Sequence, residues 1–171
     1  MEYADNKSLD EYIHNNKNKT ITKSHRQNLM LQCAEGVAYL HSLTPLILHR
    51  DLKPANILLT NNYCTLKICD FGTARELGPE MTADKGTNVY RAPEIRHNQY
   101  TEKCDVYSLA LILWEVMSGK KPFHKTDPAY TDAGIPYQTV RGVRPDLKDL
   151  NFCENVEIMK DLIEQGWDGE P

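Results

Sequence analysis

The sequence predicts an α+β fold that is mainly helical and carries one small hairpin, and three features predict it. Residues 105–117 form the most apolar stretch of the chain, and Gly119 follows it as a helix-ending residue. Two short apolar runs, at 57–59 and 66–69, flank polar turn residues, which predicts two strands joined by a hairpin. An earlier stretch that ends near Ser42 repeats apolar residues at helical spacing, at Leu29, Met30, Cys33, Val37 and Leu40.

Hydroxyl residues mark where the first two helices should begin. Ser8 with Glu11 has the spacing of a capping box, so a short helix is expected over residues 9–14. Ser24 with Gln27 repeats the pattern, so Ser24 is expected to cap the second helix.

Composition indicates a single globular domain and argues against some partners. At 171 residues with 40% hydrophobic residues, the chain has room for one sizeable core. A net charge of −4 argues against non-specific binding of nucleic acid. The apolar run 109–116 is too short to span a bilayer and contains Glu115, so no membrane is expected as a partner. The five cysteines form no C-x-x-C pair, which predicts reduced thiols and a cytoplasmic location.

The most informative stretch is the polar run from His49 to Asn56. It places Asp51 between the pair His49-Arg50 and Lys53, with Asn56 shortly after. Phosphoryl transfer needs such a set: a carboxylate to orient a hydroxyl, a cation near the transferred group, and an oxygen ligand for Mg²⁺.

Two further motifs follow in order, Asp70-Phe71-Gly72 and Ala92-Pro93-Glu94. Together with the first stretch, they make the chain resemble a eukaryotic protein kinase from end to end. The resemblance implies a protein-kinase-like fold represented by the hinge and the mainly helical C-terminal lobe. Residues 1–171 would then be a partial kinase domain, without the N-terminal lobe and the C-terminal end.

The resemblance assigns binding and catalytic roles. Asp51 would orient the substrate hydroxyl and accept its proton, and Lys53 would sit beside the γ-phosphate of ATP. Asn56 and Asp70 would hold Mg²⁺. Leu58 would form the floor of the adenine pocket. The backbone of the hinge residues Glu2 and Ala4 would hydrogen-bond adenine.

Other residues are expected to support this site. Phe71 would pack under Asp70, and Gly72 would permit the backbone turn. Asp105 would hydrogen-bond the backbone of the 49–50 turn, and His49 would serve structure. Glu94 would lack its usual arginine partner, because no matching arginine follows in this sequence.

The activation segment, residues 73–91, supplies candidate regulatory hydroxyls. Thr82 is the best candidate for an activating phosphorylation, and Arg50 would pair with the phosphate. Thr87 is expected to hydrogen-bond Asp51 and Lys53. Lys53 also favours serine/threonine over tyrosine specificity, by the same resemblance.

Several stretches narrow the resemblance to the MAP kinase kinase kinases, and among them to the subfamily of the transforming-growth-factor-β-activated kinase. They are residues 1–5, 32–41, 66–74 and 100–106. This subfamily implies MAP kinase kinases as substrates in stress and innate-immune signalling, and a TAB-type activating partner.

Two alternatives remain open. The sequence has no glycine-rich phosphate loop and no strand lysine ahead of its first residues, so the isolated chain is expected to have little or no kinase activity. It could instead be an inactive, truncated kinase lobe that acts as a binding or competitor module. Small-molecule phosphotransferases of kinase-like fold share the spacing of Asp51 and Asn56, but Ala92-Pro93-Glu94 disfavours them.

Overall fold

The computed structural model describes residues 7–15, 21–76, 88–97, 101–124 and 134–168. Four of the predicted site residues, Glu2, Ala4, Thr82 and Thr87, lie outside these ranges. The predicted α+β class is confirmed. The described helices are α1 Leu9–His14, α2 Lys23–Ser42, α3 Lys103–Ser118, α4 Ile135–Val140 and α5 Val156–Trp167.

Two small antiparallel sheets accompany the helices. One pairs β1 Ile47–Leu48 with β4 Arg75–Glu76, and the other pairs β2 Ile57–Thr60 with β3 Thr65–Ile68. Short 3₁₀ turns lie at Pro54–Asn56, Phe71–Thr73, Asn88–Tyr90, Pro93–His97 and Leu147–Asp149.

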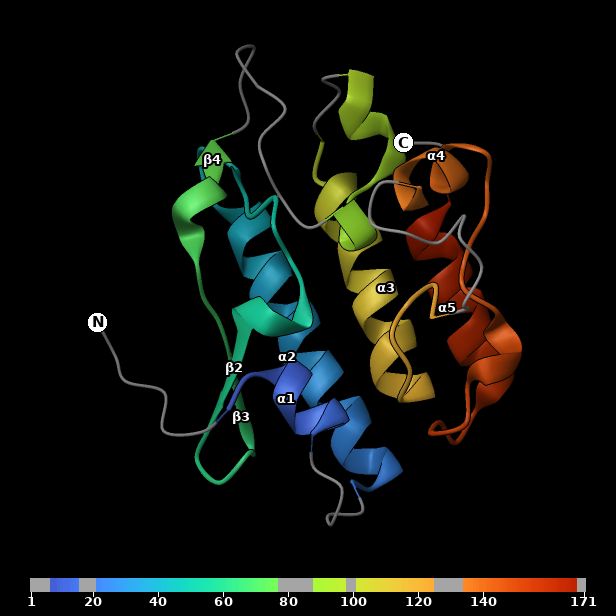
Figure 1. Cartoon of the computed structure of the whole chain (residues 1–171). Helices are drawn as coiled ribbons and strands as arrows, with labels where there is room; N and C mark the ends of the chain where they lie inside the picture. Colours follow the sequence, from blue (N-terminus) through green and yellow to red (C-terminus); the bar gives the residue numbers. More distant parts are fainter. Residues whose placement is uncertain (1–6, 16–20, 77–87, 98–100, 125–133, 169–171) are drawn as a thin grey trace.

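The long helices form the body of the fold around α3. In Figure 1, α2 lies between the β2–β3 hairpin and α3, and α5 packs on the other side of α3. Nearly every residue of α3 is buried, and Trp114 has no exposed surface. Because Gly166 of α5 has no side chain, the two helices approach closely: a Cβ there would lie 2.7 Å from that of Ala110. No helix in these ranges has both the length and the apolar character needed to cross a membrane.

The helix ends confirm some predictions and correct one. Ser8 caps α1, since its hydroxyl accepts a hydrogen bond from Glu11 N at 3.3 Å. Gly119 ends α3 with φ of 71°, the left-handed conformation that favours glycine. The prediction that Ser24 caps α2 is wrong: Thr22 does so, and its hydroxyl accepts from His25 N at 3.2 Å.

The predicted hairpin is confirmed, and its register brings its two ends together. Ile57 pairs with Ile68, so the residues before β2 and after β3 meet at the open end. There Cys69 N donates to Asn56 O at 2.9 Å. Helix α2 supports the hairpin through Gln32, whose Oε1 accepts from Leu66 N at 2.9 Å.

Candidate active site

The stretch from Asp51 to Asn56 folds back on itself so that three predicted catalytic side chains meet. Lys53 Nζ lies 2.6 Å from Asp51 Oδ2. Asn56 Nδ2 donates to Asp51 O at 2.8 Å and to Asp51 Oδ2 at 3.0 Å. One carboxylate oxygen therefore lies between an ammonium and an amide, and the amide bond to the Asp51 backbone fixes the turn.

Asp105 of α3 anchors the start of this turn by hydrogen bonds to its backbone. Its two carboxylate oxygens accept from His49 N and Arg50 N, each at 2.9 Å, and Oδ2 also lies 3.0 Å from His41 Nε2. Arg50 has φ of 70°, a left-handed conformation that costs free energy for a residue with a side chain. The buried carboxylate compensates for this cost, because both backbone N–H groups find a charged acceptor. These are the backbone hydrogen bonds that the sequence predicted.

His49 connects the catalytic stretch to the residues after β3. It is fully buried, and its Nε2 lies 3.0 Å from Cys69 O. Its own carbonyl accepts from Thr73 Oγ1 at 3.1 Å. Phe71 is half-exposed, and its ring lies 5.2 Å from the His49 ring. Its packing under Asp70 stays a prediction.

The backbone turn of the Asp70-Phe71-Gly72 motif differs from the prediction. The left-handed residue is Asp70, with φ of 62°, and Gly72 lies outside the positive-φ residues. Gly72 matters for space instead, because a Cβ at this position would lie 3.2 Å from Asp70 Oδ1. Gly72 N also donates to that oxygen at 3.4 Å, which orients the exposed carboxylate.

The residues at the open end of the hairpin fit a magnesium site. Asn56 uses Nδ2 for both of its described side-chain hydrogen bonds, so Oδ1 is left to act as a ligand. The Asp70 carboxylate follows β3 at the same end and is exposed. Mg²⁺ prefers oxygen ligands and is commonly held by one or two protein groups together with phosphates. Asn56 and Asp70 are therefore the residues that would hold it.

Leu58 lies in β2, and Cys69 directly follows β3, next to the proposed magnesium ligand Asp70. Leu58 is half-buried in β2, pairs with Lys67 across the hairpin, and forms a bridge with Ser8. Cys69 Sγ donates to Asn56 O at 3.2 Å. Burial, and then the nearby charge of Asp70, raise the pKa of the Cys69 thiol. A neutral thiol agrees with a packing role for Cys69, which is half-buried.

Among the residues that the structure describes, Glu94 accepts a weak hydrogen bond. Its Oε1 accepts from Cys104 Sγ at 3.8 Å. Its Oε2 is buried and has no hydrogen-bond partner among the described residues. The expectation that Glu94 lacks an arginine partner stays a prediction.

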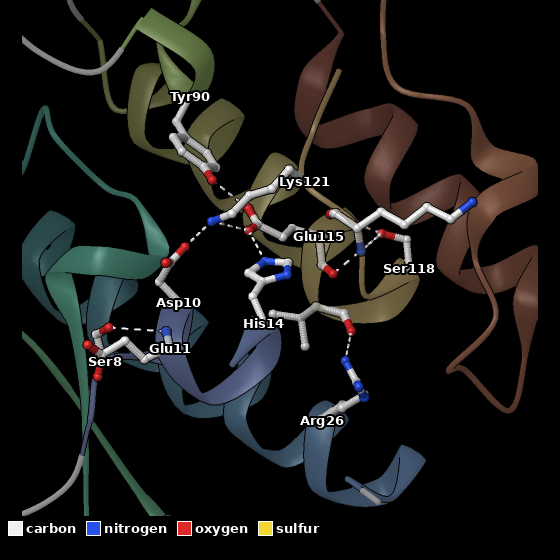
Figure 2. Close-up of polar contacts among 11 residues, drawn as sticks. Ser8, Asp10, Glu11, His14, Arg26, Tyr90, Glu115, Ser118 and Lys121 are labelled. Atoms are coloured by element: carbon white, nitrogen blue, oxygen red, sulfur yellow. Dashed lines mark hydrogen bonds and ion pairs between the residues drawn. The ribbon is translucent and has the colours of Figure 1, made fainter. Parts of the chain in front are cut away.

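A cluster around Glu115 was not predicted as part of the site. Figure 2 shows Glu115 of α3 surrounded by side chains from other segments. Tyr90 donates to its Oε2 at 2.5 Å, while His14 Nε2 and Lys121 Nζ lie 2.6 Å and 3.2 Å from its Oε1. Lys121 also pairs with Asp10 of α1. The cluster joins α1 and α3 to the end of the activation segment.

A sequence signal for this cluster exists. Glu115 interrupts the most apolar stretch of the chain, and a carboxylate that is buried in such a helix needs partners. Sequence alone does not identify these partners, because they lie far away along the chain. Burial, followed by the charge of Glu115, raises the pKa of Tyr90, so that its hydroxyl remains a proton donor.

Comparison with known proteins identifies relatives along the whole chain. The family model for the protein kinase domain matches residues 1–168. Mitogen-activated protein kinase kinase kinase 7 of Homo sapiens is 44% identical over 175 residues, which cover 100% of this chain and 28% of the relative. That of Drosophila melanogaster is 42% identical over 173 residues, or 100% of this chain and 24% of the relative. A probable serine/threonine-protein kinase of Dictyostelium discoideum is 36% identical over 167 residues, or 96% of this chain and 23% of the relative.

The chain spans about a quarter of the length of these curated relatives. Their names confirm the resemblance to the MAP kinase kinase kinases that the sequence motifs indicated. Since the kinase-domain model matches nearly all of its residues, the chain belongs to the protein kinase family.

Proposed function

We propose that this chain carries the phosphoryl-transfer site of a serine/threonine protein kinase that uses ATP and Mg²⁺. The observation that supports this most directly is the Asp51 carboxylate, which lies 2.6 Å from the Lys53 ammonium and 3.0 Å from the Asn56 amide. Phosphoryl transfer depends mainly on positioning and on electrostatic stabilisation, and this arrangement offers both.

Each side chain has one task in the proposed reaction. Asp51 orients the substrate hydroxyl and takes its proton as the oxygen attacks phosphorus. Lys53, on the same carboxylate, offsets negative charge on the transferred group. Asp105 keeps Asp51 in place through the backbone N–H groups of the preceding residues. When bound to Asn56 and Asp70, Mg²⁺ would neutralise phosphate charge.

The finer parts of the proposal come from the relatives. Two of them are mitogen-activated protein kinase kinase kinases, which supports MAP kinase kinases as the proposed substrates. A place in stress and innate-immune signalling is proposed from the sequence resemblance. A TAB-type activating partner is proposed from the sequence resemblance, and a cytoplasmic location from the five cysteines without a C-x-x-C pair. Lys53 supports serine and threonine as the acceptor residues. Thr82 is the proposed site of activating phosphorylation, with Arg50 as the residue that would pair with the phosphate.

A chimera tests this function. The N-terminal lobe of the human relative would be joined ahead of Met1, because it would supply the phosphate clamp that is expected to be needed. With Mg²⁺ and ATP, the chimera should phosphorylate a generic protein substrate, and Asp51→Asn should lower the rate about 1,000-fold. Asp161→Asn, an exposed carboxylate on α5, serves as the matched control and should leave the rate unchanged.

The same experiment separates the binding-module alternative. A folded chimera that binds ATP but transfers no phosphate would contradict the kinase proposal. If such a chimera still bound a partner protein in a pulldown, and Asp70→Asn left that binding unchanged, the chain would act as a binding module.

A further inference from the structure

The last turn of α3 is closed by groups from two distant segments of the chain. A helix ends with four backbone carbonyls that have no partner inside the helix. In α3, the Met117 carbonyl accepts from Phe152 N at 2.9 Å. The Val116 carbonyl accepts from the guanidinium of Arg26, which lies near the start of α2. A side chain from 90 positions earlier in the sequence therefore completes the end of this helix.

Arg26 is a buried cation to which no described carboxylate is paired. It is 6% exposed, and its guanidinium carbon lies 4.2 Å from the centre of the Phe152 ring. The face of this ring attracts the cation in place of water. Among the described residues, Arg26 Nε is buried and has no hydrogen-bond partner. Burial lowers the pKa of Arg26, as expected for a cation that is removed from water.

The end of α3 explains how the fold tolerates this cation. The C-terminal end of a helix carries a partial negative charge, and a cation stabilises it most where the contact is shielded from water. Val116 is the third residue from the end of α3 and is 1% exposed. Arg26 therefore compensates for the charge at this helix end and also holds it by a hydrogen bond.

The residue that Arg26 holds directly follows Glu115. Figure 2 shows Arg26 extending from α2 toward the end of α3, near the cluster in which Glu115 holds Tyr90. Glu115 has no exposed surface, so the backbone of this last turn sets the direction of its carboxylate. Without Arg26, the turn would have to open toward water or leave the Val116 carbonyl buried and unpaired. Either change would move Glu115 relative to Tyr90.

The two ends of α3 serve different parts of the site. Asp105, near its start, holds the backbone before the catalytic stretch, whereas Glu115, near its end, holds Tyr90. The contact of Arg26 lies at the second end, about 16 Å from Asp105 along the helix axis at the usual rise per residue. Loss of Arg26 should therefore disturb Tyr90 and leave the catalytic stretch in place.

We propose that Arg26 is a positioning residue of the site: by closing the end of α3 it fixes Glu115 and, through it, Tyr90 at the end of the activation segment. Tyr90 and the proposed catalytic residue Lys53 line one cavity, so a displaced Tyr90 changes the space next to the acceptor hydroxyl. The inference rests on the proposed kinase function. It adds that binding of the protein substrate, rather than of ATP, depends on a buried arginine outside the site.

Arg26→Met tests the proposal in the chimera with the human N-terminal lobe. Methionine fills much of the same space but supplies neither a charge nor a donor. The KM for a protein substrate should rise about tenfold, whereas kcat and the KM for ATP should change less than about twofold. A residue that only stabilised the fold would lower the fraction of folded enzyme, and with it the apparent kcat, and would leave KM unchanged.

Two variants serve as controls. Arg26→Lys keeps a charged donor near the Val116 carbonyl and should keep the KM for the protein substrate within about threefold of the unsubstituted value. Lys23→Met removes a positive charge from the same turn of α2, at an exposed residue, and should leave KM unchanged. A thermal melt of each variant would establish that it is folded at the assay temperature.

The 171-residue chain offers a test that needs no activity. In Arg26→Met, hydrogen exchange at the amides of Gly119 and Phe152, which bond to the same helix end, should accelerate at least about tenfold. Exchange at the amides of His49 and Arg50, which are held at the other end of α3, should stay unchanged.

The two measurements separate this proposal from the kinase function. The positioning role is overturned if Arg26→Met leaves exchange at the end of α3 unchanged, or if Lys23→Met has the same effect. It is also overturned if an active chimera keeps its KM for the protein substrate, or if the KM for ATP rises equally. An unsubstituted chimera that transfers no phosphate would refute the kinase function alone, because the exchange experiment still decides whether Arg26 fixes the end of α3.

Discussion

Replacing Asp105 with asparagine should destabilise the chain and loosen its catalytic stretch at the same time. Asp105 is 1% exposed, and its two oxygens accept from His49 N and Arg50 N at 2.9 Å each. Asparagine has nearly the same shape, so the change opens no cavity. It keeps one acceptor but turns an NH₂ group toward the other backbone N–H, which leaves two donors facing each other.

The magnitude follows from these hydrogen bonds. A hydrogen bond to a charged group contributes about 1.5–3 kcal/mol, and a buried donor without an acceptor costs a comparable amount. Asp105→Asn should therefore lower the free energy of unfolding by about 2–4 kcal/mol. The His41 contact to Oδ2 weakens as well, because the carboxylate charge is lost.

Urea unfolding and amide hydrogen exchange would measure the two effects separately. Urea titration gives the free energy of unfolding, with Asp161→Asn as an exposed control that should change it by less than about 0.5 kcal/mol. Exchange at the His49 and Arg50 amides should accelerate more than exchange within α5. If Asp105→Asn were as stable as the control, or if these amides kept their protection, the anchoring role of Asp105 would be refuted.

Three further predictions concern catalysis, packing and pH. Lys53→Met in the chimera should lower the rate of phosphoryl transfer by about 100-fold or more with little change in thermal stability; an unchanged rate would remove Lys53 from the reaction. Glu94→Gln should raise the free energy of unfolding by about 1 kcal/mol in urea titration, because it removes a charge whose Oε2 has no described hydrogen-bond partner; a clear loss of stability would show that the charge is needed. Burial raises the pKa of Cys33 from 9.0 to about 12, so the unfolded chain loses this proton first as pH rises. Stability should be fully present below pH 9 and should fall by roughly 4 kcal/mol toward pH 12. Cys33→Ala should flatten that part of the profile, and an identical profile would contradict the assignment.

Local sequence patterns predicted the elements whose causes are local. The cap at Ser8 and the helix end at Gly119 each depend on a few neighbouring residues, and both are confirmed. The error at Ser24 has the same origin. Ser24 and Gln27 have the spacing of a capping box, but Thr22, two residues earlier, is the residue that accepts from the backbone. Two hydroxyls this close compete for one helix end, and the pattern alone does not decide between them.

The left-handed turn at Asp70 shows a second limit of local reasoning. Glycine is the residue that tolerates positive φ best, so the turn was expected at Gly72. Asp70 adopts this conformation instead. Strain of this kind persists only when the surroundings impose it, and here His49 holds the preceding Cys69 carbonyl while Gly72 N holds the carboxylate. Such constraints come from packing, which the local sequence does not display.

Asp105 and Glu115 together explain why α3 determines the geometry of the site. Both are carboxylates buried in one apolar helix, about 15 Å apart along its axis at the usual rise per residue. One holds the backbone before Asp51, and the other holds Tyr90 at the end of the activation segment. A buried carboxylate is stable only while its donors stay in place, so each one fixes the position of the segment that supplies its donors. Because the helix between them is packed along its length, α3 sets the distance between the backbone before Asp51 and Tyr90. A substitution that shifts this helix should therefore reduce phosphoryl transfer by the chimera, even where it touches no catalytic residue.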